Sequence, residues 1–308
     1  MNSVARWQLY LPGKVVRRLD LLAKALTDPG DGTFVDFSQP LGEASLAPPD
    51  SVSWRVFKNP VSIFIGGVTA VLLELAEPRV RTGVWEHSGF RRDPVLRLRR
   101  TGLAAMVTVY GARSTAEAMI GGVRRMHSQV SGETPAGQAY RANDPELLRW
   151  VYATASFGFL QAYHNFVAPL SQTDRDRFYS EGQTAARLYG VEDLPRSEAG
   201  IEKLFQAMRP HLERSDIVFE FLETMRTAPI LPAPLRPAQR IIVKAAIDNA
   251  PCWSREILGL QSSGLGNVER AFVKRAASVA DRIALPSGPP ARASRRVGRD
   301  PSFLYRRG

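Results

Sequence analysis

The sequence predicts an all-α protein built around a single hydrophobic core, and three observations support this prediction. Every long periodic stretch repeats its apolar residues at the spacing of a helix rather than at the spacing of a strand. Several of these stretches begin with an Asn-Pro or Asp-Pro pair, which is typical of a helix N-terminus. The chain has 308 residues and is 44% hydrophobic, so it is long and apolar enough to bury a large core.

The predicted helices each combine an apolar face with a recognisable start. They cover residues 60–77, 94–111, 114–131, 145–170, 173–189, 198–212, 216–225, 237–249 and 266–283. The pairs Asn59-Pro60, Asp93-Pro94 and Asp144-Pro145 supply an N-cap and a first-turn proline to three of them. Ser114 with Glu117 forms a capping box that is expected to start another. No internal repeat is present.

We divide the chain into three segments. Residues 1–48 are expected to form an N-terminal helix and loop extension, and residues 49–285 a single multi-helix domain with extra peripheral helices. Residues 286–308 carry six arginines against one aspartate, which gives +5 of the formal net charge of +11. We expect this basic, Pro/Arg-rich segment to be a disordered tail, although a contact with nucleic acid or an acidic membrane is the alternative. The rest of the chain is mildly basic, so no specific nucleic-acid partner is expected.

The cysteine content and the hydropathy pattern favour the cytoplasm. Cys252 is the single cysteine, which excludes an internal disulfide and a Cys-rich zinc site, and we expect it to be a small buried residue. The first 25 residues lack the continuous apolar segment of a secretory signal. The longest apolar run, residues 61–73, is shorter than the roughly 20 residues that a membrane span needs. It predicts a buried helix and no transmembrane segment.

Several standard catalytic motifs are absent. The sequence has no G-x-S-x-G elbow, no P-loop, no H-E-x-x-H zinc motif and no G-x-G-x-x-G loop. Hydrolase, nucleotide-binding and zinc-protease functions are therefore disfavoured. The four histidines then become the main candidates, namely His87, His127, His164 and His211.

His127 stands out because it shares an apolar helix stripe with Ile120, Val123 and Val130. Its imidazole is therefore expected to point towards the core, either as a hydrogen-bonded core residue or as a metal ligand. The glycine pair Gly121-Gly122 on the same helix predicts a close approach, by a flat cofactor or by a crossing helix. The same Gly-Gly-Val sequence occurs at residues 66–68.

A second candidate group lies on the helix that begins at Pro94. Arg97, Arg100 and Thr101 occupy positions i, i+3 and i+4, so that cations and a hydroxyl are able to face one site together. An exposed basic face is the alternative interpretation.

Seven motifs occur in an order and at a spacing that resemble those of a known family. They are Asp50-Ser-Val-Ser-Trp54, Gly66-Gly67, Glu86-His87-Ser88, Asp93-Pro-x-x-Arg97-x-x-Arg100-Thr101, Val123-x-x-x-His127-x-x-Val130-x-Gly132, Tyr140-x-Ala-x-Asp144-Pro145 and Trp150-Val-x-Ala-Thr154. Over roughly residues 49–260 the chain resembles the MpaB-type oxygenases and the rubber oxygenases, also called latex-clearing proteins.

The resemblance implies an all-α fold with a globin-like core, a b-type haem and activation of dioxygen on an apolar, unsaturated or isoprenoid-like substrate. His127 matches the axial iron ligand, Arg97 and Thr101 match a polar pair beside the haem, and Arg100 matches a basic residue that is usually lysine.

The chain departs from the family pattern at two polar positions. Glu77 stands in a Glu-Leu-Ala-Glu-Pro sequence where many members have Gln-Leu-Ala-His-Pro, and Tyr152 stands where they have a histidine. A change at either position is able to alter substrate or oxygen handling.

Further candidates follow from residue type alone. Arg100, Arg124 and Arg125 are candidate partners for haem propionates. Glu77 and Glu86 are candidate bases, with a surface or capping role as the alternative. A non-catalytic haem carrier or sensor, and a haem-free helical interaction protein, are the alternative functions.

Overall fold

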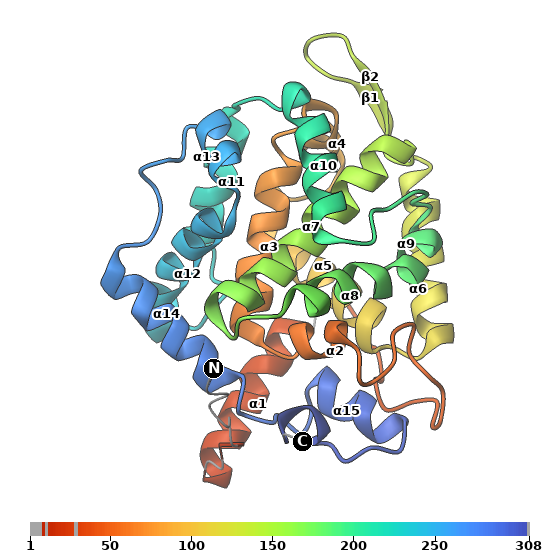
Figure 1. Ribbon diagram of the computed structural model, residues 1–308, viewed down its shortest axis with the longest axis vertical. Helices are drawn as coiled ribbons and strands as arrows, with labels where there is room; N and C mark the ends of the chain where they lie inside the picture. Colours follow the sequence, from red (N-terminus) through yellow and green to blue (C-terminus); the bar gives the residue numbers. More distant parts are fainter. Residues whose placement is uncertain (1–7, 10–11, 28–29, 307–308) are drawn as a thin grey trace.

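The computed structural model describes residues 8–9, 12–27 and 30–306, and within this part of the chain the all-α prediction is confirmed. Parts of the N-terminal extension and the last two residues of the predicted tail lie outside the described residues. Figure 1 shows helices packed around two long central ones, α3 and α7, with a small hairpin projecting at one end.

In chain order the elements are α1 (Gly13–Thr27), α2 (Val52–Phe57), α3 (Pro60–Glu74), α4 (Pro78–His87), α5 (Pro94–Tyr110), α6 (Arg113–His127), β1 (Ser131–Glu133), β2 (Ala139–Arg141), α7 (Pro145–Phe166), α8 (Gln172–Glu181), α9 (Gln183–Tyr189), α10 (Glu198–Met208), η1 (Arg209–His211), α11 (Asp216–Thr227), η2 (Ala233–Leu235), α12 (Arg236–Asn249), α13 (Cys252–Leu258), α14 (Asn267–Ala280), α15 (Pro289–Arg296) and η3 (Phe303–Tyr305). The two strands pair antiparallel, with Gly132 opposite Tyr140.

The three proline-initiated helices start where the sequence predicts. Asn59, Asp93 and Asp144 each accept backbone N–H bonds in the first turn of α3, α5 and α7 respectively. The predicted capping box at Ser114 is wrong. Ala112 precedes α6 without a side-chain cap. Ser114 instead donates both its backbone N–H and its hydroxyl to the carboxylate of Glu43, in the loop that precedes α2.

Two other expectations from the pattern need correction. The helix predicted over residues 173–189 is divided into α8 and α9 at Gly182. Cys252 is exposed rather than buried, because it begins α13 on the surface. Periodicity alone did not reveal either the break or the outward direction of the thiol.

Helices α3 and α7 cross in direct backbone contact at the centre of the molecule. A Cβ atom added to Gly66 would lie 2.7 Å from Cα of Phe159, and one added to Gly158 would lie 2.4 Å from the carbonyl oxygen of Gly66. Side chains are therefore excluded from both positions. A close approach by a helix is therefore present at Gly66, whereas Gly67 has only one neighbouring atom within 4 Å.

A buried polar network fixes α12 onto this crossing. The hydroxyl of Thr69 on α3 donates to the carbonyl of Ala246 at 2.9 Å. The amide of Asn249, the last residue of α12, donates to the carbonyl of Gly158 at 3.1 Å and to the Thr69 hydroxyl at 3.2 Å. Because every group in the network is hydrogen-bonded, it specifies one arrangement of the three helices in an otherwise apolar core.

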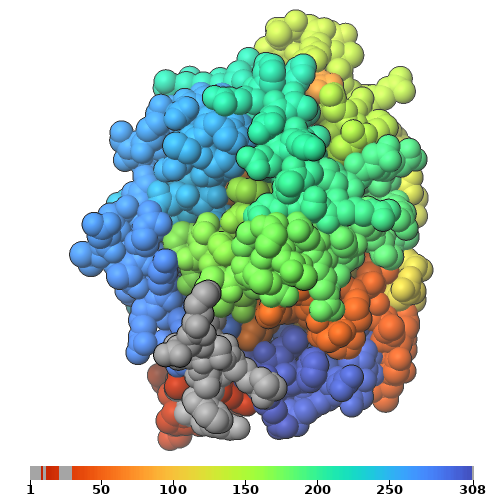
Figure 2. Space-filling model, viewed as in Figure 1, coloured from red at the N-terminus to blue at the C-terminus, as the bar shows by residue number. Residues whose placement is uncertain are grey.

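The expectation of a disordered tail is wrong for the described part of residues 286–308. Residues 289–296 form α15, and Arg296 is 1% exposed. Its guanidinium donates to the carbonyl oxygens of Phe37 at 2.8 Å and Glu43 at 2.9 Å and to the hydroxyl of Ser45. Figure 2 shows the C-terminal segment in dark blue against the orange N-terminal loop. Composition alone predicted disorder, because it does not show that Arg296 donates hydrogen bonds to buried carbonyl groups.

Among the described residues, no single helix combines the length and apolarity needed to cross a membrane. Within the same described residues, α3 and α4 taken together have the required length and apolarity, but the two helices are bent by 113° relative to each other.

The central crossing is tested by two glycine substitutions. Gly158→Ala should lower the free energy of unfolding by about 2 kcal/mol or more, because the new methyl group meets backbone atoms that have no room to move. Gly102→Ala is the matched control. It adds the same methyl group to α5 in open space and should raise stability by about 0.5–1 kcal/mol. Urea unfolding measures both, and equal effects would contradict the crossing.

The ordered C-terminal segment is tested by a pair of adjacent arginines. Arg296→Met should lower stability by about 2–4 kcal/mol, since it leaves buried carbonyls without donors. Arg295→Met, at an exposed position, should change stability by less than about 0.5 kcal/mol. Urea unfolding and hydrogen exchange of the α15 amides report the difference. Rapid exchange of α15 in the unmodified protein would show that the segment is not held.

Candidate functional site

His127 lies in the last turn of α6 with its ring half-buried. It shares the inner face of the helix with Ala116 and Ile120, which are 0% and 1% exposed. No side-chain hydrogen bond or ion pair involves the imidazole among the described residues. Burial lowers the pKa of His127, and the positive charge of Arg97 lowers it further. The ring is therefore neutral at neutral pH, with an available lone pair.

The structure brings two of the predicted site residues on α5 together. Arg97 Nη1 donates to the hydroxyl of Thr101, and this hydroxyl donates to the Arg97 carbonyl at 2.9 Å. Burial lowers the pKa of the Arg97 guanidinium, the carboxyl of Glu74 raises it, and Arg100 lowers it. The charge of Arg97 therefore acts on the carboxyl of Glu74 on α3 and on the imidazole of His127 on α6.

Arg100 does not join this pair. Its Nε donates to Asp31 at 2.7 Å in the loop that precedes α2, and its side chain is 57% exposed. The sequence spacing placed Arg100 beside Thr101, but the loop supplies a carboxylate that binds it at the surface. The effect of Arg100 on the site is that its positive charge lowers the pKa of the Arg97 guanidinium.

Glu74 is a site residue that the sequence reasoning did not identify. It ends α3 and is half-buried, and no hydrogen bond to its side chain is present among the described residues. Burial raises the pKa of its carboxyl from 4.5 to about 7, although Arg97 opposes the shift. A carboxylate that directly ends a long apolar run is the signal that was available in the sequence.

Three helices therefore place three titratable groups in electrostatic contact. The Arg97 cation interacts with the carboxyl of Glu74 and with the imidazole of His127. Such an arrangement is able to bind a metal-containing group through one imidazole and to give or take a proton at Glu74 near neutral pH. A site of three or more His, Cys, Asp or Glu ligands does not occur within the described part of the chain.

Tyr152, at one of the two positions where the chain departs from the family pattern, uses its hydroxyl in a structural hydrogen bond. It donates to the carbonyl of Gly182 at 2.9 Å, and its ring lies 6.2 Å from the ring of Tyr189. Burial raises the pKa of Tyr152 well above its usual value. Tyr189 in turn shares a hydrogen bond of 3.0 Å with Thr108 on α5. These contacts hold α7 and α9 against α5.

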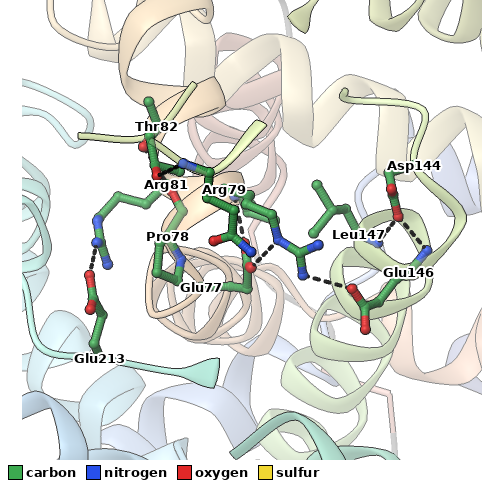
Figure 3. A network of polar contacts seen from close by, with 12 residues as sticks. Glu77, Pro78, Arg79, Arg81, Thr82, Asp144, Glu146, Leu147 and Glu213 are labelled. Carbon is green, nitrogen blue, oxygen red and sulfur yellow. Dashed lines mark hydrogen bonds and ion pairs between the residues drawn. The ribbon is translucent and has the colours of Figure 1, made fainter. Parts of the chain in front are cut away.

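Glu77, at the other such position, caps the start of α4, which is the structural alternative to its predicted role as a base. It is 1% exposed, and both carboxylate oxygens are bound (Figure 3). One accepts from Arg79 Nε at 2.6 Å and the other accepts from the backbone N–H of Val80 at 2.7 Å. Arg79 also pairs with Glu146 at 2.7 Å, which joins the start of α4 to the start of α7.

The other candidates lie away from His127 or have structural partners. Glu86 is exposed and accepts from the Tyr140 hydroxyl at 3.3 Å. His87 shares a 3.2 Å hydrogen bond with the same hydroxyl, and His164 accepts the backbone N–H of Leu170 at 2.9 Å. His211 is exposed. None of them contributes to the arrangement around Arg97.

Arg124 and Arg125 are exposed on α6. Arg124 lies three residues before His127, so the role of these arginines as partners of a cofactor held by His127 stays a prediction. Both side chains also line clefts at the surface.

The comparisons with known proteins identify one family. Residues 54–282 match the family model described as "ER-bound oxygenase mpaB/B'/Rubber oxygenase, catalytic domain". The matched range covers most of the chain and includes Glu74, Arg97, Thr101 and His127. No curated protein and no solved structure is matched. A helical chain that matches this model over most of its length is a member of an oxygenase family, and the chain belongs to the family of the mpaB/B' and rubber oxygenase catalytic domains.

Proposed function

We propose that the protein is an oxygenase that binds haem b through His127 and oxidises an apolar, unsaturated substrate with dioxygen. The observation that carries the proposal is the imidazole of His127, which is neutral, half-buried and without a partner among the described residues. Membership of an oxygenase family supports the reaction class.

The residues present fit a haem better than a bare metal ion. A haem brings four of its own nitrogen ligands and needs only one axial side chain, which the single inward-facing imidazole supplies. A histidine placed there for packing alone would be expected to hydrogen-bond through its ring nitrogens. His164 does so through Nδ1, whereas His127 does not.

The character of α3 supports an apolar substrate or cofactor surface. Phe64, Gly67 and Val71 lead to Glu74 at helical spacing, and this stripe is only partly buried although α3 lies at the centre of the fold. A Cβ atom at Gly67 would have only one neighbouring atom, 3.8 Å away on Phe159. A mostly apolar stripe that ends in one carboxyl resembles the lining of a ligand site.

Each residue then has a definite task. Haem supplies the redox chemistry that activates dioxygen when it is bound. His127 would hold the iron, and Arg97, whose guanidinium is positioned by its hydrogen bond to the exposed Thr101, would present a cation to polar atoms of the bound group. Glu74, with a pKa of about 7, is able to hold a proton or release it at its carboxyl oxygens. Arg100 is left out of the proposed ligand set because Asp31 binds it.

A non-catalytic haem carrier or sensor is the second candidate. It is favoured by Glu77 and Tyr152, since both side chains are committed to structural bonds where many family members have a histidine. Such a protein would bind haem without consuming dioxygen in the presence of an unsaturated hydrocarbon.

Haem binding is tested by reconstitution of the purified protein. The unmodified chain should show a Soret band, and His127→Ala should lose it or shift it and weaken haem binding by at least about tenfold. His211→Ala, at an exposed histidine, should leave the spectrum unchanged. An unmodified chain that stays colourless, or a His127→Ala variant with the original spectrum, would defeat the proposal.

Glu74 is tested through the pH dependence of stability. Its pKa is raised in the folded state, so between about pH 4.5 and 7 the unfolded chain binds fewer protons than the folded chain and stability falls as pH rises. Glu74→Gln removes this effect, and the variant should gain roughly 2–3 kcal/mol relative to the unmodified protein between pH 4.5 and pH 8.

The control for this measurement is Glu220→Gln, which changes an exposed carboxylate without an ion pair among the described residues. Its stability relative to the unmodified protein should not change over the same pH range. Urea unfolding at each pH gives the comparison, and parallel curves for Glu74→Gln would show that its carboxyl is not desolvated.

A further inference from the structure

The glycine pair on α6 is not explained by a crossing helix, and its role beside a flat cofactor stays a prediction. A Cβ atom added to Gly121 or Gly122 would meet only the guanidinium of Arg125, at 3.4 Å and 3.9 Å. Within the described part of the chain, no crossing helix lies within 4 Å of these positions. Because each glycine in a helix interior costs about 1 kcal/mol relative to alanine, the pair needs another explanation.

Two adjoining clefts lie beside α6. The larger has a volume of about 860 Å³ and lies between α6 and the segment that joins α9 to α10, with Arg124, Arg187 and Arg196 in its wall. The smaller has a volume of about 340 Å³ and is lined by Gly121, Arg124 and Arg125 among others. Figure 1 shows α6 and α9 side by side, and the two helices pack together.

The four arginines around the clefts are exposed, and their guanidinium groups form no ion pair among the described residues. Glu192 and Asp193 also line the larger cleft, which leaves an excess of two positive charges over the two clefts. Like charges gathered without partners repel one another, and a bound anion removes that cost.

Glycine backbone borders two of the guanidinium groups along the clefts. Gly190 ends α9 with φ +89°, and a side chain there would come within 3.5 Å of Arg124 Nε. Gly121 and Gly122 likewise leave room for the Arg125 guanidinium to lie along the helix. The amide of Asn143 donates to the Arg124 carbonyl at 3.2 Å and fixes the end of the smaller cleft.

We propose that the two clefts form one anion-binding site for a small, multiply charged phosphate, of which a diphosphate group is the simplest example. Guanidinium groups form paired hydrogen bonds with phosphate oxygens. Arg124 lines both clefts, so a ligand with two charged groups is able to reach Arg125 on one side and Arg187 or Arg196 on the other. His127 does not line either cleft, so the proposed site is distinct from the imidazole.

Isothermal titration of the full-length protein with inorganic pyrophosphate tests the proposal. The unmodified chain should bind with saturation, and Arg124→Ala should raise the Kd by at least about tenfold because both clefts lose their shared cation. Arg240→Ala, at an exposed arginine of α12 without an ion pair among the described residues, is the matched control and should bind as the unmodified chain does. Substitution of exposed arginines leaves the core intact, and circular dichroism verifies the fold.

A second measurement distinguishes a soluble phosphate from a lipid headgroup. Co-sedimentation with phosphatidylcholine vesicles that contain phosphatidic acid, lost in Arg124→Ala but accompanied by no binding of free pyrophosphate, would assign the phosphate to a lipid. Equal binding of pyrophosphate by Arg124→Ala and the unmodified chain, or no Arg124-dependent binding of either probe, overturns the proposal. The Soret band reports haem binding independently of both phosphate probes, so the two proposals fail separately.

Discussion

The structure depends on the contact between two helix backbones at Gly66 and Gly158. Since neither position has room for a Cβ atom, α3 and α7 approach more closely than side chains would permit, and the buried amide of Asn249 hydrogen-bonds to the Gly158 carbonyl at the crossing. The direction of α3 is thereby fixed. That direction decides where its last residue, Glu74, meets the charge of Arg97.

Desolvation decides the chemistry of the candidate site. Burial raises the pKa of Glu74 and lowers those of Arg97 and His127, so each of the three groups is shifted towards its neutral form. The carboxyl and the guanidinium oppose each other's shift, whereas the guanidinium adds to the shift of the imidazole. The result is a neutral imidazole on α6 and a carboxyl on α3 that titrates near neutral pH, and each of them interacts with the guanidinium of Arg97 on α5.

The arginines of this strongly basic chain have different roles because their surroundings differ. Arg296 is buried and donates to backbone carbonyls of the N-terminal loop, so that the C-terminal segment becomes part of the fold. Arg79 joins two helix N-termini through Glu77 and Glu146. Arg124, by contrast, lies between two clefts without an acidic partner among the described residues. Net charge alone does not distinguish these roles.

The sequence by itself determined the helical class, the starts of α3, α5 and α7, and the inward direction of His127. All of these follow from local rules, since helical spacing and capping are set within a few residues along the chain. The adjacency of Arg97 and Thr101 follows from the same spacing. A globin-like core, a haem and the proposed roles of these residues stay predictions.

Only the tertiary structure decided which polar groups have partners. Arg100 shares its helix turn with Thr101 but binds Asp31, which is 69 residues away in the sequence. Glu77 accepts hydrogen bonds on both carboxylate oxygens. Glu74, three residues earlier in the sequence, has no hydrogen bond to its side chain among the described residues, and its carboxyl is the group that titrates near neutral pH. These outcomes depend on burial and on contacts between segments that are distant in the chain, and no local pattern encodes them.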